Sequence, residues 1–191
     1  MLLNEIGLGE SSGYSLSGSV TPDLIRSKVW LLQKLEQLRP RVGTVYILGS
    51  WYGNLSLYMT LQPRLEHGRI INVDRHAGRL RTGAALLRTA GARDVENMHR
   101  DANDLDYRQL GQDGVVINTS LNDIQGDEWF QNIPGGTLVV LQARDHVPNE
   151  KFSSVRDVMA QYPLSEILYA GTRRLRDPET GYHRFMVIGI R

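Results

Sequence analysis

The 191-residue sequence has no cysteine, no long apolar run and almost no net charge. Without cysteine, the chain cannot form disulfides, thiolate metal sites or a cysteine nucleophile. No apolar run approaches the roughly 20 residues that a membrane-spanning helix requires, so we expect no contact with a membrane. The formal net charge of +1 lacks the basic excess typical of nucleic-acid-binding domains, so nucleic acid is not the expected partner.

The N-terminal region also lacks the basic segment followed by an apolar one that secretory signals contain, so we expect a cytoplasmic protein. Residues 1–20 are rich in serine and glycine, which is typical of irregular structure. They form either a mobile terminus or a flap that closes over a ligand, with Tyr14 as its one large contact. We assign residues 1–39 to this flap and a capping helix, and residues 40–191 to the main domain.

The sequence after residue 20 alternates between helical and strand patterns. Thr21 and Pro22 form a typical helix start, and Pro40 ends the leucine-rich pattern that follows. Short apolar segments bounded by turn residues predict strands at 44–49, 69–74, 95–99, 114–118, 137–142, 166–171 and 184–190. Helices are predicted between most of these strands, at 54–61, 79–88, 127–132 and 152–162.

This alternation predicts a parallel sheet with helices on both faces. The last two strands are separated by the turn-rich residues 176–181 and by no helix, so they should pair as an antiparallel hairpin. The predicted fold class is therefore α/β: a Rossmann-like three-layer sandwich whose mostly parallel seven-stranded sheet ends in a C-terminal antiparallel hairpin.

The first predicted strand runs into the turn Gly49-Ser-Trp-Tyr-Gly53, which matches no phosphate-binding pattern. A dinucleotide fingerprint needs G-x-G-x-x-G, and a P-loop needs G-x-x-x-x-G-K-[ST]. Acidic residues follow the next two strands. A carboxylate at Asp74 can accept both hydroxyls of a ribose, and one at Asp101 can accept from the amino group of adenine. The pattern predicts an adenosine site without pyrophosphate, which disfavours a nicotinamide-dependent oxidoreductase.

This combination resembles the class I S-adenosylmethionine-dependent methyltransferases over residues 40–191. Gly49 corresponds to the start of the family's glycine-rich first motif, and Asp74 and Asp101 to the acidic residues after its second and third strands. The terminal antiparallel hairpin is also typical of this family. The resemblance implies an S-adenosylmethionine-binding domain with cofactor contacts from Gly49, Ser50, Trp51, Tyr52, Asp74, Arg75, Asp101, Ala102, Asn118 and Thr119.

The sequence departs from the family pattern at Trp51, which replaces the usual central glycine of the first motif. The ring either lies near the cofactor's sulfonium or packs between helix and sheet. In the first case, a cation–π contact would contribute on the order of 0.5–2 kcal/mol.

Polar residues after the fourth and fifth strands are candidates for the reaction side of the site. Asn118 is a candidate to hold an acceptor amine or the cofactor's amino-acid end, and its alternative role is to end a strand. His146 is a candidate proton acceptor, so these two are the candidate catalytic residues. The candidate substrate-binding residues are Tyr14, Ser120, Asp123 and Arg144, of which Arg144 suits a carboxylate. The five histidines show no metal-ligand spacing, so we expect no metal site.

The resemblance implies an enzyme that transfers a methyl group from S-adenosylmethionine to a small molecule, at an amine or on a carboxylate-bearing acceptor. Two alternatives stay open. The protein either transfers or cyclises the aminocarboxypropyl group of the same cofactor, or binds the cofactor without catalysis. The released product, S-adenosylhomocysteine or methylthioadenosine, distinguishes the first alternative from methyl transfer.

Overall fold

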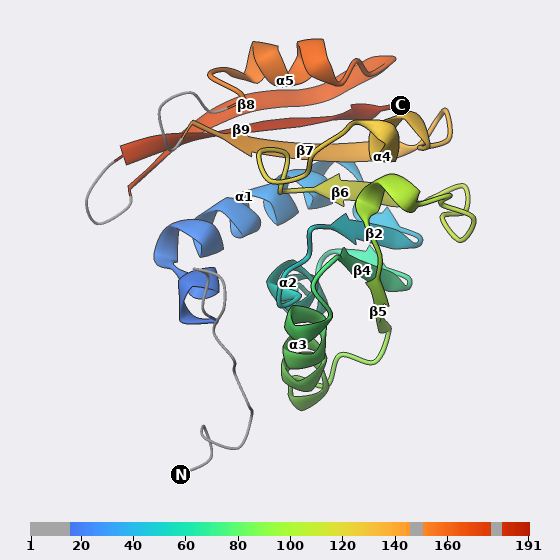
Figure 1. The fold of residues 1–191 in the computed structure, drawn as a ribbon. Helices are drawn as coiled ribbons and strands as arrows, with labels where there is room; N and C mark the ends of the chain where they lie inside the picture. The colour runs from blue at the N-terminus through green and yellow to red at the C-terminus, as the bar shows by residue number, and fades with distance from the viewer. Residues whose placement is uncertain (1–15, 146–150, 177–180) are drawn as a thin grey trace.

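The computed structural model describes residues 16–145, 151–176 and 181–191. Its centre is a seven-stranded sheet in the order β5-β4-β2-β6-β7-β9-β8, which runs from bottom to top in Figure 1. The strands are β2 (Val45–Leu48), β4 (Ile70–Asp74), β5 (Val95–His99), β6 (Val115–Asn118), β7 (Leu138–Arg144), β8 (Glu166–Arg176) and β9 (Gly181–Ile190). A separate parallel pair joins β1 (Arg41–Val42) to β3 (Glu66–His67).

The helices connect these strands. They are η1 (Ser17–Val20), α1 (Pro22–Leu38), α2 (Asn54–Leu61), α3 (Ala77–Thr89), η2 (Ala102–Asp104), α4 (Glu128–Gln131) and α5 (Val155–Gln161). In the described ranges, none of them is both long and apolar enough to cross a membrane.

The strand pairing confirms the predicted fold class. Strands β2, β4, β5, β6 and β7 pair in parallel, whereas β9 pairs antiparallel with both β7 and β8. The strand order reverses between β2 and β6, so the carboxyl ends of these two strands form the point where open α/β sheets bind ligands. The hairpin strands are longer than predicted, because the exposed arginines 173 and 174 continue β8 along the open edge of the sheet.

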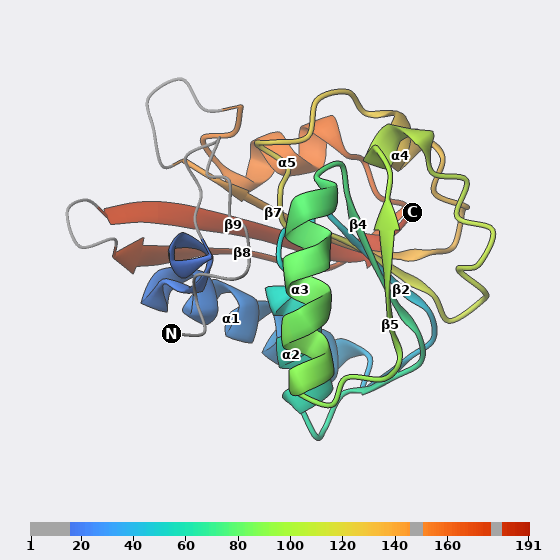
Figure 2. The same ribbon diagram turned by 60° about the horizontal axis from the view of Figure 1, so that its bottom comes forward.

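Two hydrophobic cores fill the two faces of the sheet. Trp30 and Leu31 of α1 and Leu55 of α2 pack with Ile47 in one core. On the other face, Trp129 of α4 and Val158 of α5 belong to the second core, together with the side chains of alternate strand residues. Figure 2 shows the resulting layers, with α1, α2 and α3 on one side and α4 and α5 on the other.

Helix α1 starts as the sequence predicts. The Thr21 hydroxyl accepts a hydrogen bond from the Leu24 N–H at 3.4 Å, and Pro22 occupies the first helical position. Because α1 shares its core with the sheet, its N-terminal half lies beside the carboxyl ends of β2 and β6. Tyr14, in the segment predicted as a flap, lies outside the described residues.

Candidate functional site

The turn after β2 depends on unusual backbone conformations. Gly49, Trp51 and Gly53 have φ angles of 60°, 56° and 72°, a region that side chains disfavour. A Cβ atom at Gly49 would lie 2.8 Å from the side chain of Ser120. Glycine is therefore required where β2 approaches the loop that follows β6.

Asp74 holds this turn against the end of β4. Its buried carboxylate accepts hydrogen bonds from the Trp51 N–H and the His76 N–H, each at 2.9 Å. The Ser50 N–H also donates to the Val73 carbonyl at 3.0 Å. Each carboxylate oxygen of Asp74 keeps a further lone pair for a ligand.

A cavity of about 320 Å³ opens beside this turn. The sequence predicted six of its lining residues as cofactor contacts: Gly49, Trp51, Asp74, Arg75, Asp101 and Ala102. It did not predict seven others: Val73, His76, Arg79, Arg100, Asn103, Ile124 and Gln125. The volume falls within the usual range of ligand sites. Val73, Ala102 and Ile124 supply apolar contacts beside two carboxylates, a combination that suits a nucleoside.

A second cavity, of about 40 Å³, adjoins the first at the switch point. The predicted residues that line it are Gly49, Ser50, Trp51, Thr119, Ser120, Asp123 and Arg144. It is closed on the other side by Leu24, Lys28, Ile47, Asn54 and Leu55. The hydroxyl of Ser50 is buried here and has no hydrogen-bond partner within the part of the chain that the structure describes.

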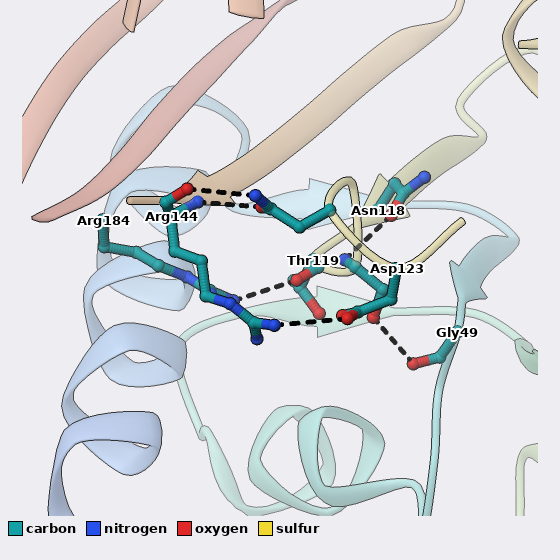
Figure 3. A network of polar contacts seen from close by, with 8 residues as sticks. Gly49, Asn118, Thr119, Asp123, Arg144 and Arg184 are labelled. Carbon is teal, nitrogen blue, oxygen red and sulfur yellow. Dashed lines mark hydrogen bonds and ion pairs between the residues drawn. The ribbon is translucent and has the colours of Figure 1, made fainter. Parts of the chain in front are cut away.

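Figure 3 shows the polar contacts that join the ends of β2, β6 and β7 and a residue of β9 at this cavity. Arg184 on β9 donates to the Thr119 carbonyl at 2.9 Å, and Arg144 on β7 pairs with Asp123 at 3.2 Å. The Ser120 hydroxyl donates to the Gly49 carbonyl at 3.2 Å. These contacts fix the loop after β6 relative to the turn after β2.

Lys28 is a cation at the small cavity that was not predicted from the sequence. It lies on α1, and burial together with the nearby charge of Arg184 lowers its pKa to about 7. Its position in the sequence indicates burial, because Lys28 falls in the apolar stripe formed by Leu24, Leu31 and Leu35. The docking of α1 beside the site, however, could not be read from its sequence.

Two predicted site residues, Asn118 and Tyr52, line neither cavity. The Asn118 side chain is fully buried and accepts from the Ser120 N–H at 2.9 Å, so it caps the strand end. Tyr52 is buried behind the turn. His146, like Tyr14, lies outside the described residues, so the roles of both stay predictions. In the described ranges, no three acidic or histidine side chains are grouped to hold a metal.

Trp51 lines both cavities and therefore lies between them. The guanidinium carbon of Arg79 is 5.7 Å from its ring centroid, a cation–π contact from α3. The ring thus contacts α3 through Arg79, and its place beside the sulfonium stays a prediction.

Replacement of Trp51 separates its ring from its backbone. We expect the free energy of unfolding of Trp51→Gly to exceed that of Trp51→Ala by about 1 kcal/mol, because only glycine adopts this φ without strain. Both variants should bind S-adenosylhomocysteine about 10-fold more weakly than the wild type, since both lose the ring. Urea unfolding and calorimetry measure the two effects. Equal stability of the two variants would contradict the assignment of strain.

The fold is similar to that of several solved structures. No protein-family model and no curated protein matches the sequence. Among solved structures, the N-methyltransferase NodS from Bradyrhizobium japonicum, in complex with S-adenosyl-L-homocysteine, matches with a TM-score of 0.64 and 12% identity, over 88% of each chain. An rRNA methylase from Streptococcus thermophilus matches with a TM-score of 0.60 and 11% identity, over 90% of this chain and 99% of that one.

The N-terminal domain of EvdMO1 with S-adenosylhomocysteine bound matches with a TM-score of 0.61 and 13% identity, over 97% of this chain and 92% of that domain. The present chain spans only 40% of the longer EvdMO1 chain. At such identities the likeness concerns architecture, and it agrees with the observed strand order and terminal hairpin. The chain has the fold of the class I S-adenosylmethionine-dependent methyltransferases.

Proposed function

We propose that this protein binds S-adenosylmethionine and transfers its methyl group to a small molecule. The observation that carries the proposal is the large cavity, in which Asp74 and Asp101 follow consecutive strands of this fold. Carboxylates there suit the ribose hydroxyls and the adenine amino group, and the turn after β2 offers no pyrophosphate site.

The two adjoining cavities suit the two ends of the cofactor. The nucleoside fits the large cavity, and the amino-acid end fits the small one, where Ser50 and Lys28 present polar groups. Trp51 then lies beside the sulfur. The cofactor supplies an activated methyl group on a sulfonium, so the protein needs only to align the acceptor and exclude water.

We place the acceptor at the pair formed by Asp123 and Arg144. The Arg144 guanidinium suits an acceptor carboxylate, and Asp123 suits an amine.

Calorimetric titration tests the cofactor assignment. We expect S-adenosylmethionine and S-adenosylhomocysteine to bind with micromolar dissociation constants, and NAD not to bind. Mass spectrometry of the products then identifies the reaction, because methyl transfer releases S-adenosylhomocysteine. Release of methylthioadenosine would assign aminocarboxypropyl chemistry instead. Binding without turnover across a broad acceptor panel would favour a non-catalytic protein.

A further inference from the structure

We propose that Lys28 is the counter-ion of the cofactor's methionine carboxylate and couples cofactor binding to the uptake of one proton. This inference rests on the proposed function, because it assigns the small cavity to the amino-acid end of the same ligand. It adds a pH-dependent step to cofactor capture.

The geometry points to a small anionic group that is attached to the nucleoside. The small cavity holds only about 40 Å³, and it shares Gly49 and Trp51 with the large one. The buried Ser50 hydroxyl lines it without a hydrogen-bond partner in the described ranges. A carboxylate between Ser50 and Lys28 would satisfy the hydroxyl and pair with the amine.

The charges around Lys28 explain why it can titrate. Burial and the Arg184 guanidinium lower its pKa to about 7, so the amine of the free protein is largely neutral at pH 8. The other charged groups that line the same cavity are Arg144 and Asp123, which pair with each other. In the described ranges, η1 and α2 contain no charged residue, Asp23 pairs with Arg26 on α1, and Arg173 of β8 lies over Trp30.

A bound carboxylate favours the ammonium form and therefore raises the pKa of Lys28. Below pH 7 the lysine is already charged, and the affinity does not depend on its titration. Above pH 7 each molecule of ligand must bind together with a proton. The affinity then falls, by up to about 10-fold for each pH unit, until the pKa of the complex is reached.

Calorimetry at pH 6 and pH 9 tests this linkage with S-adenosylhomocysteine and with methylthioadenosine, which lacks the amino-acid end. We expect the affinity of wild-type protein for S-adenosylhomocysteine to fall on the order of 10- to 100-fold between these pH values. The affinity for methylthioadenosine should change by less than about 3-fold, because this ligand does not reach Lys28. At pH 8, titrations in phosphate and in Tris buffer should reveal the uptake of nearly one proton.

Lys28→Arg is the decisive variant, because arginine keeps the charge but does not lose its proton. We expect it to bind S-adenosylhomocysteine with no proton uptake and with a flat pH profile beyond the ligand's own amine titration, which the wild type shares. Lys28→Gln should lower the affinity for S-adenosylhomocysteine and leave the affinity for methylthioadenosine unchanged. Lys34→Gln, on the same helix, removes an exposed amine that donates to Gln37. It should leave the affinity for both ligands, and its pH dependence, unchanged.

The outcomes separate this inference from the proposed function. Binding of S-adenosylhomocysteine with the same pH profile in wild type and Lys28→Arg would overturn the role of Lys28 and leave the cofactor assignment intact. An equal loss of affinity for both ligands in Lys28→Gln would also overturn the role of Lys28. Failure of the wild type to bind either ligand at any pH would overturn the proposed function, and this inference with it.

Discussion

Asp74→Ala should bind S-adenosylhomocysteine and methylthioadenosine at least about 100-fold more weakly than the wild type. Both ligands carry a ribose, and two hydrogen bonds to a charged acceptor contribute roughly 1.5–3 kcal/mol each. Isothermal titration calorimetry measures the loss. The effect on both ligands distinguishes Asp74 from Lys28, whose substitution should affect only the ligand with the amino-acid end.

The same substitution should also lower the stability of the fold. Asp74 accepts from the backbone N–H groups of Trp51 and His76, and a hydrogen bond to a charged group contributes about 1.5–3 kcal/mol. Binding must therefore be measured well below the reduced melting temperature. Asp106→Ala is the matched control, because it removes an exposed carboxylate that pairs with Arg108. Unchanged ribose affinity in folded Asp74→Ala would refute the placement of the nucleoside.

Gly83→Ala should destabilise the protein by about 1–3 kcal/mol, although alanine usually stabilises a helix by about 1 kcal/mol relative to glycine. The reason is a close approach of α3 to the turn after β2. An added Cβ atom would lie 2.5 Å from the Tyr52 carbonyl oxygen, and this backbone is held in place by the bonds to Asp74. Thermal unfolding measures the loss, and a displaced turn should also weaken S-adenosylhomocysteine binding.

Gly78→Ala provides the control within the same helix. The nearest atom to its added Cβ is a guanidinium nitrogen of Arg81 at 3.9 Å, which is ordinary contact. We expect this variant to be as stable as the wild type, or more stable by up to about 1 kcal/mol. If Gly83→Ala were stabilised to the same degree, α3 would be free to move away from the turn.

The fold was largely predictable from local patterns. Apolar segments such as residues 114–118 and 137–142 are short, β-branched and bounded by turns, so strand identity and the parallel arrangement followed. The brief pairing of β1 with β3 was missed, since two-residue strands carry no periodic signal. The ends of β8 and β9 were placed too far from their turn, because the polar residues 172–174 and 181–184 carry no clear strand pattern.

The candidate site was predictable where a residue follows a strand directly. Asp74 and Asp101 were found this way and line one cavity, because parallel strands end at the same edge of the sheet. Residues that helices bring to the site were missed, as Lys28 and Arg79 show, since helix docking depends on tertiary packing. For Asn118 the sequence left two roles open, and its side chain is buried, accepts from the Ser120 N–H and lines neither cavity.

The insertion of β9 between β7 and β8 sets the order in which a nascent chain can complete this fold. Both neighbours of β9 leave the ribosome before it does, so β7 has an unpaired edge during that interval. Arg184, which binds the Thr119 carbonyl beside the small cavity, arrives with the same strand. The end of the site that we assign to the methionine group therefore matures last, after the nucleoside half has been synthesised.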